Sequence, residues 1–500
     1  MKQNLFSRPL TMATITVPAG AIQNIRAAID AASSGDLINL TAISFNITAS
    51  GFSTNTPGTS PATFARFGAK TLSFQGASQG GTIVNGNARI FTTQQDAGSG
   101  VPTDINLKSM TLSYAGASNY ILQFGDKIYK SGTDACGNQY FDSINVIPGI
   151  DIIDVAFSGT HAGGNGTAGT YMEFSSGYSA AGSAPLNFNL SQSVVNLTGQ
   201  SGFNPSTPSG GSSFLQVQGD GITISQTNFN ENGYRNSLSI WNSSNVIIDR
   251  NGFSRPSYPF IRASGETIRN SSGVVSANSF KDGAYLDLRD FCNDTLNIKG
   301  NTFRMNGVTN PAGLFGGSGP FGILLRDASA FSGSTLTFGT GVTDGNLFED
   351  GLLFKNITST ATSFTGSFFA SVTNPANTGF PISKTFVKAS VGGTGSDSLT
   401  GSTGEDWISG DLGNDTLTGG TGNDAFVFAT ALNASTNVDT ITDYGRGDKI
   451  WLDDSIFSSG FAGISQSIVG GNLELSYSGT KFAVLQGVTS TRPSTEFILF

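Results

Sequence analysis

Gly-Gly-Thr-Gly-Ser-Asp-Ser-Leu-Thr occupies residues 392–400, and the same nine-residue frame continues without a gap to residue 427. The four blocks are 392–400, 401–409, 410–418 and 419–427. In each block glycine stands at positions 1 and 4, aspartate at position 6 and an apolar residue at position 8. A strict short period with a repeated apolar position indicates a solenoid, because each block adds the same strand and turn.

The repeated turns carry oxygen ligands for a hard cation. The position-6 carboxylates would stack in rows, and the glycines allow turns that point carbonyl oxygens inward. Ca²⁺ prefers such oxygen ligands. We therefore predict Ca²⁺ binding at Asp397, Asp406, Asp415 and Asp424, with the turn glycines Gly393, Gly395, Gly404, Gly413, Gly420 and Gly422. Stacked carboxylates repel one another without the ion, so binding and folding should be coupled.

The apolar position-8 residues predict the core of a narrow parallel β-roll. They are Leu399, Ile408, Leu417 and Phe426. The alternative, a solvated acidic linker, would not keep these residues in phase.

The nonapeptides resemble the repeats-in-toxin (RTX) family, whose repeat is Gly-Gly-x-Gly-x-Asp-x-aliphatic-x. Residues 439–450 resemble that family's continuation after the roll, and Glu496-Phe497-Ile498-Leu499-Phe500 is similar to the C-terminal signal of type I secretion substrates. The resemblance implies an extracellular protein exported by a type I secretion apparatus. Residues 1–9 lack the apolar core of about 7–15 residues of an N-terminal secretory signal.

A longer period precedes the nonapeptides. An aliphatic residue, then Asn or Thr, then Phe recurs in Ile224–Thr227–Phe229, Ile248–Asn251–Phe253, Val275–Asn278–Phe280 and Ile298–Asn301–Phe303. Repeats of about 20–30 residues with short strands predict a right-handed parallel β-helix with inward Phe ladders. An Asn in the tight bend of each turn can satisfy local backbone groups while tolerating a left-handed conformation. An antiparallel sandwich of short strands is the alternative.

The expected fold class is all-β, with an N-terminal capping helix. Ile22, Ile25, Ala28, Ile29 and Ala32 follow helical spacing before Gly35 ends the helix. We expect an N-terminal tail (1–20), a β-helix (21–390), a calcium-binding β-roll (391–430) and a post-RTX region with the secretion signal (431–500).

Charge is sparse and localised. Charged residues make up 12% of the chain, and its net charge of −9 is carried by residues 392–454. A nucleic-acid partner is excluded by the lack of clustered Lys and Arg, and a membrane span by the lack of an apolar run of about 18 residues. The glycine motifs 164–169 and 317–322 open no βαβ unit, so they do not indicate nucleotide binding.

Cys136 and Cys292 are expected to be unpaired thiols. They are 156 residues apart, which corresponds to roughly 30 Å along a regular solenoid at about 4.8 Å per turn.

The region from Ile22 to about residue 360 resembles the pectin-lyase-like β-helix superfamily. This resemblance implies outward carboxylates and Arg on one strand face as catalytic candidates. Alternation buries Leu286 and Leu288 and places Asp287 and Arg289 outward. Arg326–Asp327 and Asp249–Arg250 are further pairs; ordinary surface ion pairing is the alternative for all three.

Mannuronan epimerases combine a β-helix with RTX modules, but their Tyr-Gly-Phe-Asp-Pro-His motif is absent here. The single histidine, His161, is either a general base or a loop residue without a catalytic role. The preferred function is an extracellular calcium-binding structural protein of a bacterial cell surface, in a surface layer, sheath, filament or adhesin. Its partners would be further copies of itself or cell-surface polysaccharide. The alternative is a secreted lyase, hydrolase or epimerase acting on an acidic polysaccharide.

Overall fold

The fold is described from a computed structural model of the whole chain. The described residues are 13–17, 22–41, 44–47, 63–66, 72–86, 89–92, 104–116, 122–124, 129–133, 136, 139–142, 149–161, 172–175, 178–179, 182–183, 185–198, 213–230, 236–254, 264–281, 284–304, 321–326, 334–341, 343–372 and 382–500.

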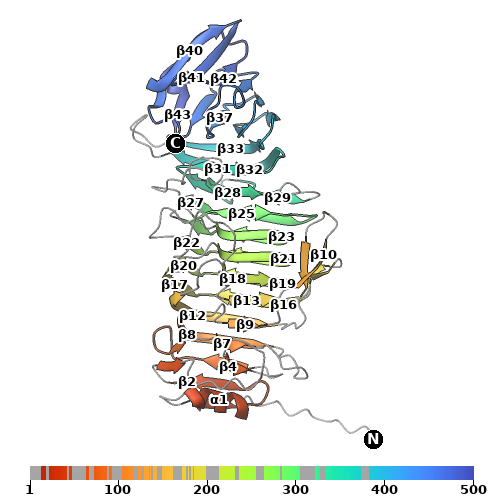
Figure 1. Ribbon diagram of the computed structural model, residues 1–500, viewed down its shortest axis with the longest axis vertical. Coiled ribbons are helices and arrows are strands. Elements are labelled where there is room, and N and C mark those ends of the chain that lie inside the picture. The colour runs from red at the N-terminus through yellow and green to blue at the C-terminus, as the bar shows by residue number, and fades with distance from the viewer. Residues whose placement is uncertain are drawn as a thin grey trace.

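Most of the chain winds into a parallel β-helix whose turns stack along the long axis (Figure 1). Its strands form three columns, and within each column the strands of successive turns pair in parallel. The first column contains β1 (Thr14–Val17), β2 (Leu37–Leu40), β5 (Leu72–Gln75), the first halves of β8 (Ile105–Gly116) and β12 (Ile150–His161), β16 (Pro185–Ser191), β19 (Asp220–Ser225), the second halves of β21 (Asn236–Asp249) and β23 (Ser264–Ser276), β26 (Thr295–Lys299) and β29 (Thr335–Thr337).

The other two columns complete each turn. The second column contains β3 (Ser44–Ile47), β6 (Ile83–Gly86), the second halves of β8 and β12, β17 (Val194–Thr198), β20 (Asn228–Asn230), β22 (Gly252–Ser254), β24 (Ser279–Phe280), β27 (Thr302–Arg304), β30 (Asn346–Glu349) and β32 (Thr362–Val372). The third contains β4 (Thr63–Arg66), β7 (Arg89–Thr92), β9 (Leu122–Phe124), β13 (Met172–Ser175), β18 (Ser213–Gln218), the first halves of β21 and β23, β25 (Leu286–Arg289), β28 (Phe321–Arg326) and β31 (Leu352–Asn356). The predicted β-helix is confirmed, and the antiparallel sandwich is excluded.

A ladder of phenylalanines fills the interior, as the repeat predicts. Successive rings are stacked with centroids 5.0, 4.9, 4.7 and 4.8 Å apart. The rings belong to Phe229, Phe253, Phe280, Phe303 and Phe348, all at most 1% exposed. Offset aromatic stacking adds to the burial of apolar area, so each turn positions the next.

A second ladder is made by asparagine side chains at a corner. In each pair the Nδ2 group donates to the Oδ1 atom of the next turn, at 3.0 Å from Asn251 to Asn278, 3.0 Å from Asn278 to Asn301 and 2.9 Å from Asn301 to Asn346. One detail of the prediction is wrong. The left-handed residue is not the Asn but the residue before it, with φ of 54° at Arg250, because the buried Asn points inward to bond its neighbours.

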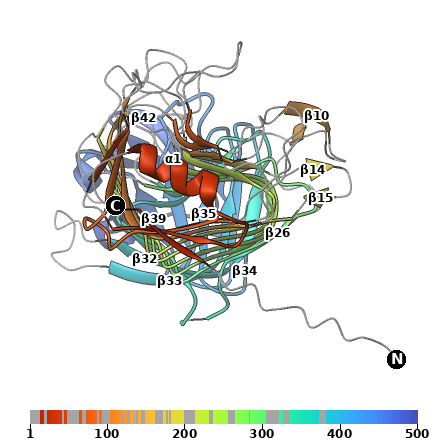
Figure 2. The same cartoon turned by 90° about the horizontal axis from the view of Figure 1, so that it is seen from below.

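The N-terminal end of the solenoid is covered by α1 (Ile22–Ala31), which lies across it in Figure 2. Ile25, Ala28 and Ile29 are buried, as the helical spacing predicts. The segment expected to be a tail contributes β1, because residues 14–17 pair with β2.

The C-terminal part continues the stack as a roll of two sheets. One sheet contains β33 (Ile382–Val391), β35 (Asp406–Ser409), β37 (Ala425–Phe428), β39 (Lys449–Leu452) and β43 (Phe497–Leu499). The other contains β34 (Ser398–Ser402), β36 (Thr416–Gly420), β38 (Asp439–Ile441), β42 (Thr480–Leu485), β41 (Asn472–Tyr477) and β40 (Ile464–Val469). The short 3₁₀ helices are Gly460–Gly463 and Ser494–Glu496. Since β33 pairs with β32 on one side and β35 on the other, the strand stack crosses the expected boundary at 390/391.

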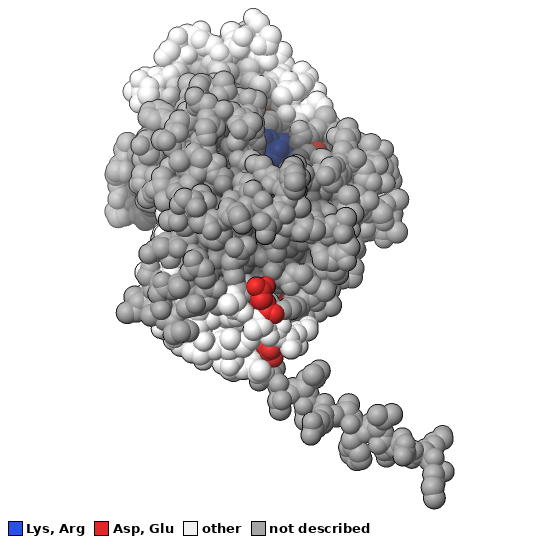
Figure 3. All heavy atoms as spheres, turned by 60° about the horizontal axis from the view of Figure 1, so that its bottom comes forward, with Lys and Arg blue, Asp and Glu red and all other residues white. Residues whose placement is uncertain are grey.

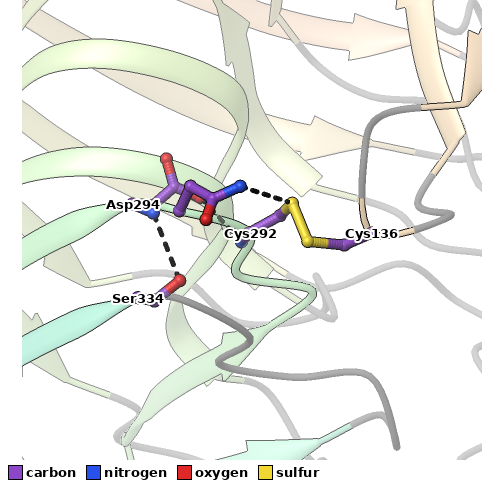
Figure 4. Close-up of a disulfide and its surroundings, with 5 residues drawn as sticks. Cys136, Cys292, Asp294 and Ser334 are labelled. Carbon is purple, nitrogen blue, oxygen red and sulfur yellow. Dashed lines mark hydrogen bonds between the residues drawn. A yellow bond between two sulfur atoms is a disulfide. The ribbon is translucent and has the colours of Figure 1, made fainter.

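The prediction of two unpaired thiols is wrong. Cys136 and Cys292 form a disulfide with Cα atoms 5.8 Å apart (Figure 4). Cys136 lies in the turn between β10 (Tyr129–Thr133) and β11 (Gln139–Asp142), an antiparallel hairpin beside the solenoid. In Figure 1, β10 runs along the long axis rather than across it. The hairpin therefore carries Cys136 along the axis to the turn that contains Cys292. A smaller hairpin, β14 (Tyr178–Ser179) and β15 (Gly182–Ser183), is also outside the three columns.

Charge and membrane features are limited in the described part of the chain. Seen with the N-terminal end forward, its charged side chains are few and scattered (Figure 3). None of its helices has the length and apolarity of a membrane span. Of the two glycine motifs, only Gly322 lies within the described residues, in β28 beneath the Phe348 ring.

Candidate calcium centre

Aspartates of the roll stand in two columns, one for each sheet. In each column the backbone N–H of one Asp donates to the Oδ1 atom of the next. The distances are 2.7 Å from Asp397 to Asp415 and 3.2 Å from Asp415 to Asp439. The second column comprises Asp406, Asp424 and Asp448, with both distances 2.9 Å. All of these aspartates except Asp397 are buried.

Two members of these columns, Asp439 and Asp448, were not predicted as site residues. The step from Asp415 to Asp439 and from Asp424 to Asp448 is 24 residues instead of 18. A detectable signal was nevertheless present, because Asp439 and Asp448 are nine residues apart and each has an isoleucine two positions later. The glycine at position 1 is replaced there by Asp443, whose carboxylate accepts from the N–H groups of Gly419 and Gly420 at 2.9 and 2.8 Å.

Burial raises the pKa values of the buried column carboxylates, and repulsion within the columns adds to the effect at Asp415, Asp424 and Asp439. Burial, with the charge of Asp397 adding to it, raises the pKa of Asp415 to about 6. Burial also raises the pKa of Asp424 to about 6, with the charges of Asp448 and Asp406 adding to it. Burial and the neighbouring charge of Asp415 raise the pKa of Asp439 well above its ordinary value. A cation placed between the turns would therefore favour the charged form of these three carboxylates.

The donor set fits calcium at a specific atom. Asp415 Oδ2 is buried and has no hydrogen-bond partner in the described structure. A Cβ built on Gly410 would lie 2.3 Å from this oxygen and 2.8 Å from Asp439 Oδ2. Both carboxylate oxygens therefore lie beside the Cα of Gly410, in space that a side chain would fill. A cation between the turns would supply the partner that Asp415 Oδ2 lacks and would offset the repulsion between the two carboxylates.

Main-chain carbonyl oxygens of one turn lie close to the glycines of the next turn in the same column. A Cβ on Gly413 would lie 2.2 Å from the carbonyl oxygen of Gly395, and one on Gly422 equally close to that of Gly404. Gly413 and Gly422 have φ of 135° and 141°, a region that favours glycine. Gly420 has φ of 93°. The sixth predicted glycine, Gly393, donates its N–H to Asp397 Oδ2 at 2.7 Å.

No three side chains of His, Cys, Asp or Glu converge as a metal cluster within the described residues. The arrangement instead suits ligands that alternate between carboxylates and main-chain carbonyls of adjacent turns. Ca²⁺ accepts such mixed oxygen sets of six to eight ligands.

Comparison with known proteins identifies these turns. The family model described as the RTX calcium-binding nonapeptide repeat matches residues 391–426 in four copies. These residues are RTX calcium-binding repeats. The RTX repeats bind Ca²⁺, as predicted, and they imply a secreted, extracellular protein. No curated protein matches the chain.

One solved structure with a similar strand path is "Structure of PL6 family alginate lyase AlyGC". It shares 10% sequence identity with a TM-score of 0.31, covering 88% of this chain and 71% of the lyase chain. Nothing about activity follows for this chain from a similarity of that size.

Three of the catalytic candidates, Asp287, Arg289 and Arg326, lie on the third column and contact one another instead of facing solvent separately. Asp287 is completely buried instead of outward-facing. Its Oδ2 accepts from Arg289 at 3.0 Å, and its Oδ1 accepts from Arg326 Nε at 3.0 Å. The structure thus joins Asp287, Arg289 and Arg326 across adjacent strands, since Arg289 and Arg326 are register partners.

The remaining candidates do not join this group. Asp327 lies outside the described residues. Asp249 and Arg250 form their own ion pair at 2.6 Å, with the arginine side chain 62% exposed. His161 is the last residue of β12, in register with Gly116, and thus ends a strand rather than lying in a loop.

The segment that resembles a secretion signal is part of the fold. Phe497, Ile498, Leu499 and Phe500 are each at most 9% exposed, and β43 pairs with β39. Glu496 accepts from Arg492 at 2.7 and 2.9 Å.

Proposed function

We propose that this protein is an extracellular calcium-binding structural component of a bacterial cell surface that assembles with further copies of itself. The observation that carries the proposal is the strand stack from β1 to β43, which α1 covers at one end. At the other end lies the second sheet of the roll, whose edge strand is β40. A long stacked rod with one protected end and one available sheet edge suits directional contacts between copies.

The edge strand β40 has the character of a contact surface. Its pairing in the described structure is with β41 alone. Ile468 and Val469 are 46% and 50% exposed. Exposed apolar side chains on an edge strand favour pairing with another chain.

The disulfide supports an extracellular location. Cys136–Cys292 links a side hairpin to the solenoid, and such bonds persist in oxidising compartments. RTX proteins are type I secreted, and we propose that residues 496–500 act as the signal before they fold. The same proposal includes the calcium ligands named above, the roll at 391–430, the post-RTX region at 431–500 and the β-helix before them, which β1 extends into the segment 1–20 that was expected to be a tail.

The proposal is tested by imaging and light scattering of the full chain with Ca²⁺ and with chelator. We expect ordered polymers with Ca²⁺ and monomers without it. Ile468→Lys should reduce polymer formation, whereas the matched control Ile247→Lys, also 46% exposed but on β21, should not.

Two results would contradict the proposal. Monomers at every calcium concentration would remove self-assembly, and turnover of a uronan in a parallel panel of acidic polysaccharides would favour the enzymatic alternative. Equal loss of polymers in both variants would exclude β40 as the contact.

A further inference from the structure

Lys388 stands at the base of one aspartate column. β33 pairs in parallel with β35, and the Cα partner of Lys388 is Asp406. The column then continues through Asp424 and Asp448. β33 therefore has a lysine at the register position where the following turns have an aspartate.

The ammonium group is held by main-chain oxygens of the first turn above it. Lys388 Nζ donates to the carbonyl oxygen of Thr400 at 2.6 Å and to that of Gly401 at 3.2 Å. Its positive charge acts on the Asp406 carboxylate of the same turn. The two carbonyl groups and the carboxylate are thus compensated by a cation that belongs to the chain.

The same oxygens recur one turn higher, and no lysine among the described residues donates to them. Lys384 Nζ donates instead to the carbonyl oxygen of Asn423, and its charge acts on Asp424 and Asp448. Thr418 and Gly419 are the equivalents of Thr400 and Gly401, 18 residues later. A Cβ on Gly401 would lie 2.1 Å from the Gly419 carbonyl oxygen and 2.6 Å from Asp406 Oδ2. A carbonyl and a carboxylate therefore meet between these turns, where a Ca²⁺ ion would have oxygen ligands from both.

We propose that Lys388 is a built-in substitute for calcium at the junction between the β-helix and the roll. Its ammonium group takes the place of an ion below Asp406, so the calcium series of this column begins between Asp406 and Asp424. The first turn of the column is consequently neutralised before any ion binds. It provides a formed template on which the calcium-dependent turns stack, and it lowers the number of ions that the chain binds by one.

The proposal is tested by counting calcium in the full chain by equilibrium dialysis and by measuring its melting temperature in chelator. Lys388→Asp extends the aspartate column by one turn, and we expect it to bind one more Ca²⁺ per chain than the wild type. Lys388→Met removes the cation without adding a ligand, and we expect the wild-type calcium count but a melting temperature in chelator lower by a few degrees. Matched controls are Lys481→Asp and Lys481→Met, at a lysine outside the columns on β42; both should keep the wild-type count.

The outcomes separate this proposal from the calcium assignment itself. A folded Lys388→Asp variant with the wild-type count would overturn the proposal, as would a Lys388→Met variant with an unchanged melting temperature in chelator. If Lys388→Asp does not fold, the melting temperature of Lys388→Met decides. If the wild type bound no calcium, that result would instead contradict the assignment of calcium binding to the repeats.

Discussion

Lys355 of β31 and Asp411 of the third nonapeptide form an ion pair whose side chains are only 3% and 4% exposed. Burial raises the pKa of Asp411, whereas the ammonium of Lys355 lowers it. Asp411 stands at position 2 of its repeat, where two of the other repeats have glycine, and it has φ of 66°. The pair fastens the last turns of the β-helix to the roll.

Lys355→Met should destabilise the junction, because it leaves a buried carboxylate without its cation. Removal of one partner of a buried pair costs about 3–5 kcal/mol. The measurement is the free energy of unfolding of the roll in denaturant, followed by Trp fluorescence in Ca²⁺. The double variant Lys355→Met, Asp411→Asn should recover part of the loss, since no charge remains buried.

The control for this pair is Lys481→Met. Lys481 pairs with Glu474 at 3.2 Å, with side chains 36% and 25% exposed, so its loss should cost about 0–1 kcal/mol. Equal effects of Lys355→Met and Lys481→Met would show that the junction does not depend on the buried pair.

Calcium removal should release the C-terminal strand. β43 pairs with β39, and β39 begins directly after Asp448, the last aspartate of its column. In hydrogen exchange with Ca²⁺, the β43 amides should be protected. In chelator they should exchange faster by at least tenfold, while the amides of β21 keep their protection. Equal protection of β43 in both conditions would mean that the strand folds independently of the ion.

The asparagine ladder should contribute more to stability than its surface counterparts. Asn278 donates from Nδ2 to the Ile248 carbonyl at 2.9 Å and to Asn301 Oδ1 at 3.0 Å. Asn278→Ala leaves buried groups without partners, at about 1–3 kcal/mol for each. Thermal denaturation should show a clear decrease, whereas Asn230→Ala, whose amide makes an exposed 3.3 Å bond to Asn196, should change the melting temperature little. A similar small change in both variants would count against the ladder.

Contacts between equivalent residues of successive turns were predictable from the sequence. Contacts between non-equivalent residues of different turns were not. The Phe229–Phe253 stack follows directly from the period, because equivalent residues lie one turn apart. The burial of Asp287 depends on Arg326, 39 residues later, so strand alternation alone placed it outward. Asp439 was missed because an insertion changes the step while its chemistry remains.

The disulfide between Cys136 and Cys292 also joins non-equivalent residues of different turns, so the repeat period did not predict it. The separation of 156 residues assumed regular turns, whereas the β10–β11 hairpin runs beside them. In the oxidised, folded protein we expect no reaction with a maleimide and, after reduction and unfolding, labelling of two thiols. Cys136→Ser and Cys292→Ser remove the same bond, so both should lower the free energy of unfolding by a similar amount, about 2–5 kcal/mol. Labelling of two thiols before reduction would contradict the bond, and unequal losses would show that one cysteine contributes through its own packing.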